Sequence, residues 1–326
     1  DWSSDVCSSD LYATDPRIRN SDGASADAYY GRRALATSHG FVGEYKRSSC
    51  SLSVSPIASQ SAGDTLGMQR DYWYSVARNF AGLESPEQVG RIASERTLRR
   101  LGARKVATTR VPVIFDPQTA RSLLAALGHA INGDSIYRNA SYLAGKLGAR
   151  IASDLITIID DGAMRGGFGS APFDDEGVKT RRNVVVERGT LNSYLLNSYT
   201  GRKLNMATTG NAARGLAGSP SVGTHNFYLQ AGAESPEEII ASVQSGFFVT
   251  DFIGHDVNVV TGDISRGASG MWIERGALAY PVEEVTVAGN LLDIFRNIAA
   301  VGSDLKFRGS MASPTILVSE MSVAGQ

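Results

Sequence analysis

The sequence predicts an α+β protein, in which a small α+β domain precedes a larger C-terminal domain dominated by antiparallel sheet with a few packed helices. Two segments, 184–191 and 272–278, each contain a strand, a glycine turn and a returning strand. Such hairpins indicate an antiparallel sheet rather than an alternating array of strands and helices. The chain has 326 residues, 42% hydrophobic and 20% charged, which suits two domains or one large domain.

Four helix starts are marked by local signals. Ser85 and Ser235 each stand before a Pro-Glu pair in a capping-box pattern, with proline at the first helical position. Asp116 also precedes a proline, and Asn290 precedes an apolar run. Apolar residues at helical spacing extend the helices that follow Ser235 and Asn290 to about positions 243 and 298.

The domain boundary is expected where a charged helix gives way to an apolar strand. That change occurs near residues 107–111, so we expect a first domain at 12–106 and a second domain at 107–326. The segment 315–318 is apolar and follows a proline, which predicts a final strand in the second domain.

The first residues, 1–11, are mostly small and polar and resemble translated adapter sequence, so we expect a non-native tail. A disordered native tail is the alternative. No signal peptide pattern opens the chain and no apolar run is long enough for a membrane helix, so the cytoplasm is the expected location. The net charge of −1 gives no general attraction to nucleic acid or to an anionic membrane.

Candidate catalytic side chains are few. The four histidines, His39, His129, His225 and His255, show no helical spacing to one another, and the cysteines lie only at positions 7 and 50. Zinc enzymes hold the ion with three protein ligands, so we expect neither a metal nor another cofactor. His129 can in principle pair with a nearby aspartate, but a hydrogen-bonded structural histidine is the favoured interpretation, as is a buried role for the lone Cys50.

Two loops invite a functional interpretation. The glycine-rich segment 165–169 offers backbone donors for phosphate, yet it matches no nucleotide-binding fingerprint, and a flexible substrate-facing loop is the favoured alternative. The acidic segment 174–176 precedes a glycine, and solvated turn chemistry is its favoured interpretation over paired acid/base catalysis.

Several longer strings resemble one family. The segments 15–24, 169–177, 209–229, 261–274 and 280–291 are similar to motifs of the TldD/PmbA family, and the last three resemble its PmbA branch, also called TldE. The similarity runs from residue 12 to the end of the chain. The family's first domain is expected to be missing.

The resemblance implies a pair of related subunits. In the TldD type, a HExxxH helix and a cysteine of the C-terminal domain bind zinc. The corresponding helix at 123–134 keeps only the second histidine, as His129, and no cysteine follows Cys50. The resemblance therefore implies a PmbA/TldE-type subunit without catalytic residues of its own, in a complex that degrades or processes short unfolded peptides.

The implied partners are a TldD-type metallopeptidase subunit or a second copy of the chain, and an unfolded peptide, with no nucleic acid and no membrane. An exposed sheet edge around 222–229 is expected to capture extended peptides through main-chain hydrogen bonds. We expect substrate contacts at polar residues of the matching strings, namely Thr224, His225, Asn226, Asp263 and Arg266.

Two other functions stay open at this point. The chain could be a stand-alone metallopeptidase with a divergent site around His129, His225 or His255. It could also be a peptide-binding protein with no enzymatic partner.

Overall fold

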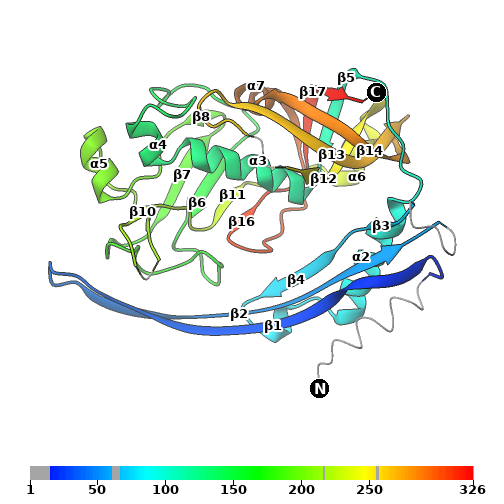
Figure 1. Ribbon diagram of the computed structural model, residues 1–326. Helices are drawn as coiled ribbons and strands as arrows, with labels where there is room; N and C mark the ends of the chain where they lie inside the picture. Colours follow the sequence, from blue (N-terminus) through cyan, green and yellow to red (C-terminus); the bar gives the residue numbers. More distant parts are fainter. Residues whose placement is uncertain (1–14, 61–66, 216, 255–256, 326) are drawn as a thin grey trace. The chain divides into compact units, whose positions relative to one another are not determined.

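A computed structural model describes residues 15–60, 67–215, 217–254 and 257–325 (Figure 1). The chain folds as two compact units. Unit 1 extends to Arg33 and continues at Lys46–Arg104, and unit 2 contains Ala34–Tyr45 and Lys105–Gln326. Within the described segments, no helix has the length and apolar character needed to cross a bilayer.

Unit 1 is built on the two longest strands of the described chain. These strands, β1 (Ile18–Ala36) and β2 (Val42–Ala58), are neighbours in a four-stranded sheet. Two short strands, β3 (Gln69–Arg70) and β4 (Trp73–Ala77), pair with β2 in antiparallel register. From Cys50 onward, alternate residues of β2 are buried, because one face of this part of the sheet packs into a small apolar core.

The helix α2 (Pro86–Arg99) covers that core and follows the short 3-10 helix η1 (Phe80–Gly82). Ser85 accepts the backbone N–H of Gln88 at 3.2 Å, as the capping signal predicts. Val89 and Ala93 are fully buried against Val54.

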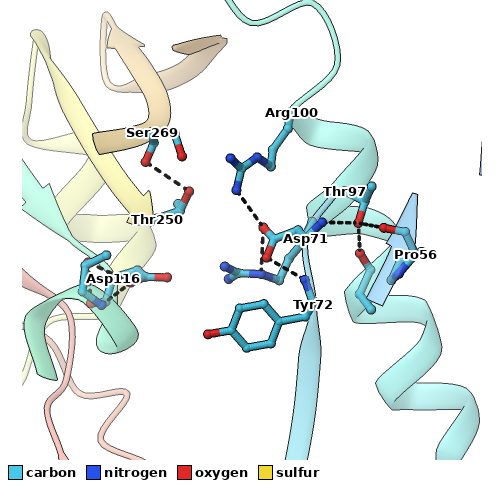
Figure 2. A network of polar contacts seen from close by, with 11 residues as sticks. Pro56, Asp71, Tyr72, Thr97, Arg100, Asp116, Thr250 and Ser269 are labelled. Atoms are coloured by element: carbon cyan, nitrogen blue, oxygen red, sulfur yellow. Dashed lines mark hydrogen bonds and ion pairs between the residues drawn. The ribbon is translucent and has the colours of Figure 1, made fainter. Parts of the chain in front are cut away.

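A buried carboxylate ties α2 to the sheet of unit 1, as Figure 2 shows. One Asp71 oxygen lies 3.3 Å from Arg96 Nε and 3.8 Å from Arg100 Nη1. The backbone N–H of Asp71 donates to the Thr97 hydroxyl at 3.2 Å, and that hydroxyl donates to the Ala93 carbonyl at 2.9 Å. If α2 moved away, the buried Asp71 carboxylate would lose its charged partners, which costs free energy. The network therefore stabilises the position of the helix on the sheet.

The first sheet of unit 2 has six strands in the order β14-β13-β12-β5-β17-β15. The ladder between β5 and β12 is parallel and the other ladders are antiparallel. β14 also pairs with β17, so five of the six strands form a closed ring. The strands are β5 (Thr109–Phe115), β12 (Ser245–Ile253), β13 (Asp263–Glu274), β14 (Ala277–Asn290), β15 (Ile298–Val301) and β17 (Ile316–Ala324).

The second sheet of unit 2 has five strands in the order β16-β11-β6-β7-β8. β11 and β16 run parallel, and the other pairs are antiparallel. A separate two-stranded ladder joins β9 (Ala212–Ala213) to β10 (Ser221–Val222). The strands of the larger sheet are β6 (Ile158–Asp161), β7 (Arg182–Glu187), β8 (Thr190–Leu191), β11 (Phe227–Leu229) and β16 (Met311–Ala312).

The helix α3 (Pro117–Ala130) connects the two sheets, because it contacts β5 and β12 of the first and β11 and β16 of the second (Figure 1). Asp116 caps it by accepting the Thr119 N–H at 2.8 Å, and its buried face carries Leu123, Leu124 and Leu127. Shorter helices are α4 (Gly133–Tyr137), α5 (Ser198–Leu204), α6 (Pro236–Ala241) and α7 (Leu291–Arg296).

The predicted fold class is confirmed, as are the four helix starts, both hairpins and the final strand. Two helix ends were predicted wrongly. α6 ends at Ala241, so Val243 lies beyond it, and α7 ends at Arg296 because Ile298 already pairs in β15. The expected exposed edge at 222–229 is also wrong for β11, which has a paired strand on each side, β6 and β16.

Candidate functional site

A cavity of about 170 Å³ opens beside the C-terminal half of α3. Residues of α3, of the segment around β10 and of β16 line it, together with Asn132 and Leu195. They are Ala125, Gly128, His129, Asn132, Leu195, Val222, Gly223, Thr224 and Met311. His129 itself is exposed, so its imidazole is accessible from solvent.

Asn132, which also lines this cavity, uses its side-chain amide and oxygen in hydrogen bonds within the fold. Its side-chain amide donates to the Val222 carbonyl at 3.0 Å, and its oxygen accepts the Asp134 N–H at 2.9 Å. These bonds cap α4 and fix β10 next to the end of α3.

His225, the neighbour of Thr224, is buried and lies among backbone carbonyls. Its Nε2 lies 2.7 Å from the Gly210 carbonyl oxygen, and its Nδ1 lies 3.3 Å from the Gly169 carbonyl oxygen. A neutral imidazole has one N–H and can donate to only one of these oxygens, whereas the imidazolium donates to both. The ring therefore connects two loops of unit 2.

Asp160 is fully buried next to this histidine. It accepts the His225 backbone N–H at 2.7 Å and the Asn211 side-chain amide at 2.6 Å. Burial raises the pKa of the Asp160 carboxyl, while the charge of His225 and these hydrogen bonds oppose the rise.

Asn226 is fully buried and holds the glycine-rich loop. Its amide donates to the Asp161 carbonyl at 2.6 Å and to the Ser170 hydroxyl at 2.8 Å, and its oxygen accepts the Gly169 N–H at 2.8 Å. A Cβ atom at Gly169 would lie 2.3 Å from the His225 carbonyl oxygen, so only glycine fits there. The Gly169 N–H therefore serves the fold and not a phosphate group.

The acidic segment at 174–176 makes structural bonds that its sequence did not indicate. Asp174 accepts the Ala212 N–H at 3.0 Å, Asp175 accepts the Arg214 N–H at 2.7 Å, and Glu176 accepts the Ser198 N–H at 2.8 Å. Burial raises the pKa of Asp174, which is almost completely inaccessible, and its hydrogen bonds with backbone N–H groups oppose the rise. The expected turn chemistry is present, because Asp174 also accepts the Glu176 N–H at 3.0 Å and the Val178 N–H at 2.9 Å, but the expectation that this carboxylate is solvated is wrong.

The other two predicted contact residues belong to β13. Asp263 is exposed, and hydrogen bonds from the Thr261 hydroxyl at 2.7 Å and the Asn290 amide at 3.0 Å keep the pKa of its carboxyl low. Arg266 is mostly buried; it donates to the Gly254 carbonyl at 2.7 Å and stacks on Phe252 with 4.2 Å to the ring centroid.

The five predicted contact residues therefore do not converge. Thr224 lines the cavity, and His225 and Asn226 bond to loops and to β6. Asp263 and Arg266 belong to the other sheet of the unit. Substrate contact at these residues stays a prediction. No sequence pattern associates His129 with Thr224, because their positions are far apart in the chain.

Family models match most of the chain. The PmbA/TldA metallopeptidase C-terminal domain matches residues 108–325, and the central domain of the same family matches residues 5–101. This chain belongs to the PmbA/TldD family.

Curated relatives of this family agree with the assignment. The metalloprotease PmbA of Escherichia coli O157:H7 is 40% identical over 312 residues, which are 96% of this chain and 66% of that protein. A PmbA homolog of Haemophilus influenzae is 37% identical over 95% of this chain and 66% of its own length. The chain thus spans slightly less than two thirds of the length of these two relatives.

Solved structures of the family share the fold. A Bacteroides thetaiotaomicron protein named for modulation of DNA gyrase has a TM-score of 0.90 and 29% identity, covering 99% of this chain and 70% of that chain. TldE from Thermococcus kodakarensis has a TM-score of 0.88 over 98% of this chain and 72% of that chain. At 23% identity, the second match supports the fold alone.

The cavity lining does not fit the zinc ion that the family's TldD branch implies. His129 supplies one imidazole, and the residue one helical turn before it is Ala125. The lining contains no carboxylate and no thiolate, so His129 is its only side chain of a type that binds zinc. A zinc site needs at least three protein ligands. Among residues 15–60, 67–215, 217–254 and 257–325, no group of three or more His, Cys, Asp or Glu side chains is placed to hold a metal ion.

The remaining candidate side chains do not extend the cavity. Cys50 is buried in unit 1, as expected, and His39 is exposed near the turn between β1 and β2. His255, named in the stand-alone peptidase hypothesis, lies outside the described residues. Of the other histidines in that hypothesis, His225 has both ring nitrogens against carbonyl oxygens and only His129 faces the cavity.

Proposed function

We propose that this chain is a PmbA/TldE-type subunit that joins a TldD-type metallopeptidase subunit in degrading or processing short unfolded peptides in the cytoplasm. In this proposal residues 12–106 and 107–326 are its middle and C-terminal domains, and the TldD-type partner supplies the zinc. The observation that carries the proposal is the cavity beside α3, whose lining contains one imidazole, two neutral polar side chains and otherwise small or apolar residues. Such a lining can hold part of a peptide, but one imidazole does not supply the three protein ligands that a catalytic zinc ion requires.

The names of the relatives support a role related to metallopeptidases. The Escherichia coli relative is a metalloprotease PmbA, and the Haemophilus influenzae relative is a metalloprotease PmbA homolog. Because the chain spans 66% of the PmbA relative, the activity, substrates and partners of the whole protein are included in the proposal.

An unpaired strand edge beside the cavity supports a peptide as the substrate. β16 is the last strand of its sheet and, in the described part of the chain, pairs only with β11. Extended peptides bind such edges through main-chain hydrogen bonds, which are independent of the peptide's sequence. Met311 of β16 also lines the cavity, so main chain and side chain of one peptide could be held together.

The test is reconstitution with a TldD-type protein. The chain and a TldD-type protein are purified separately and after co-expression, and each sample is assayed for bound zinc and for cleavage of a labelled unfolded peptide. We expect co-purification, cleavage by the pair, and neither zinc nor cleavage for the chain alone.

The alternatives give different results. One zinc per chain in the isolated protein, with cleavage that a chelator abolishes, would establish a stand-alone metallopeptidase. Peptide binding without co-purification and without cleavage would indicate a non-enzymatic peptide-binding protein.

A further inference from the structure

Two polar side chains in the cavity make no hydrogen bond or ion pair within the described residues. They are the imidazole of His129 and the hydroxyl of Thr224. The next residues in the chain behave differently, since His225 and Asn226 use their polar side-chain atoms in internal hydrogen bonds. Polar groups at a protein surface cavity that the fold does not use are available to a bound molecule.

The size of the cavity indicates what can enter. Its volume of about 170 Å³ is close to that of an apolar cavity of roughly 150 Å³ that binds benzene. Leu195, Val222 and Met311 supply apolar walls, and the lining has no carboxylate, ammonium or guanidinium group. The cavity therefore suits one aromatic or branched aliphatic side chain and disfavours a charged one.

We propose that this cavity is a side-chain pocket for an extended peptide, which inserts one large apolar residue while its main chain lies along the free edge of β16. The Thr224 hydroxyl and the His129 imidazole bond to the peptide's amide groups at the rim. The inference rests on the proposed function in one respect, which is that the substrate is a peptide.

The experiment measures binding by the isolated chain, with no TldD-type protein present. The probes are fluorescein-labelled Gly-Ser host peptides that carry one guest residue: alanine, leucine, phenylalanine or lysine. Fluorescence polarisation gives the dissociation constants. Leucine and phenylalanine guests should bind at least about tenfold more tightly than alanine, because they bury apolar surface that the alanine guest does not have. The lysine guest should bind no better than alanine.

Two variants and a matched control locate the pocket. Ala125→Phe fills the cavity and should abolish the preference for leucine and phenylalanine. Thr224→Val keeps the shape and removes the hydroxyl, so all guests should bind about three- to tenfold more weakly. Ala233→Phe adds the same ring at an exposed position outside the cavity and should bind like the wild type.

Thermal melts show whether Ala125→Phe folds. If it does not fold, the inference is tested by the weaker peptide binding expected of Thr224→Val. Equal affinity for alanine, leucine and phenylalanine guests in the wild type would overturn the inference. A preference that persists in a folded Ala125→Phe variant would overturn it too. These outcomes are independent of cleavage by the reconstituted pair, which tests the proposed function separately.

Discussion

Thr224 and His225 are adjacent in sequence, yet they belong to two regions with opposite character. The region around Asp160, His225 and Asn226 is buried, and its polar atoms are bonded to one another or to backbone groups. The cavity with His129 and Thr224 is open, and these two side chains have no partner among the described residues. The difference teaches that, of two adjacent polar residues in one motif, one side chain can be bonded within the fold while the other stays available to a ligand.

The largest expected effect is the loss of the buried carboxylate. Asp160→Ala removes the acceptor of the His225 N–H and of the Asn211 amide, and it should lower the free energy of unfolding by about 2–5 kcal/mol. Urea denaturation followed by circular dichroism measures this change. His129→Ala, in the open region, is the control and should change stability by less than about 0.5 kcal/mol. Equal losses in both variants would remove the distinction between the regions.

Asn226→Ala should have the next largest effect. It leaves the Gly169 N–H without its acceptor and removes both bonds that the amide donates, so we expect a loss of about 2–3 kcal/mol by the same measurement. Limited proteolysis should also cut the loop at 162–170 faster in the variant, because the loop loses this attachment. If the loop of the variant were cut no faster than the loop of the wild type, the role assigned to Asn226 would be contradicted.

A pair of glycine substitutions compares packing in the two regions. Gly169→Ala should destabilise the protein by about 1–3 kcal/mol, since its Cβ would lie 2.3 Å from a backbone oxygen. Gly128→Ala in α3 should stabilise it by up to about 1 kcal/mol, since its nearest neighbours are a Phe227 ring atom at 3.4 Å and a Thr224 methyl at 3.7 Å. Differential scanning calorimetry on both variants gives the two signs, and the same sign for both would contradict the comparison.

The smallest expected effect is a pH dependence in the buried region. Because burial raises the pKa of Asp160, the folded state keeps its proton at pH values where the unfolded chain has lost it. The contribution of this carboxyl to the free energy of unfolding should therefore fall as the pH rises above the ordinary carboxyl value of about 3.9. Asp160→Asn lacks this titration. The stability difference between wild type and variant, measured by urea denaturation between pH 3.5 and 7, should favour the wild type more at the acidic end.

Local signals made part of the fold predictable from the sequence. The caps at Ser85 and Asp116 act within one helical turn, so the residues themselves determine where α2 and α3 begin. The end of α7 depends on the pairing of Ile298 with Val318, which no local pattern records. The full length of strands β1 and β2 was not predicted, because many of their residues are polar and exposed, which weakens the hydrophobic alternation.

The candidate site was less predictable for a related reason. His129 and Thr224 meet only because α3 contacts β11 and β16, a tertiary arrangement that spacing within the sequence does not encode. The turn at Asp174 was predicted from the glycine at position 177, but the burial of this carboxylate was not, because its further partner Ala212 lies far along the chain.

The closed ring of strands in unit 2 has a consequence for biosynthesis. β5 lies between β12 and β17 in the ring, and β17 follows β5 by roughly 200 residues in the chain. While the ribosome is still adding the intervening segments, one edge of β5 has no partner and the ring stays open. The unit can therefore close only after translation has passed residue 324, and a nascent chain that stalls earlier exposes an apolar strand edge to other chains.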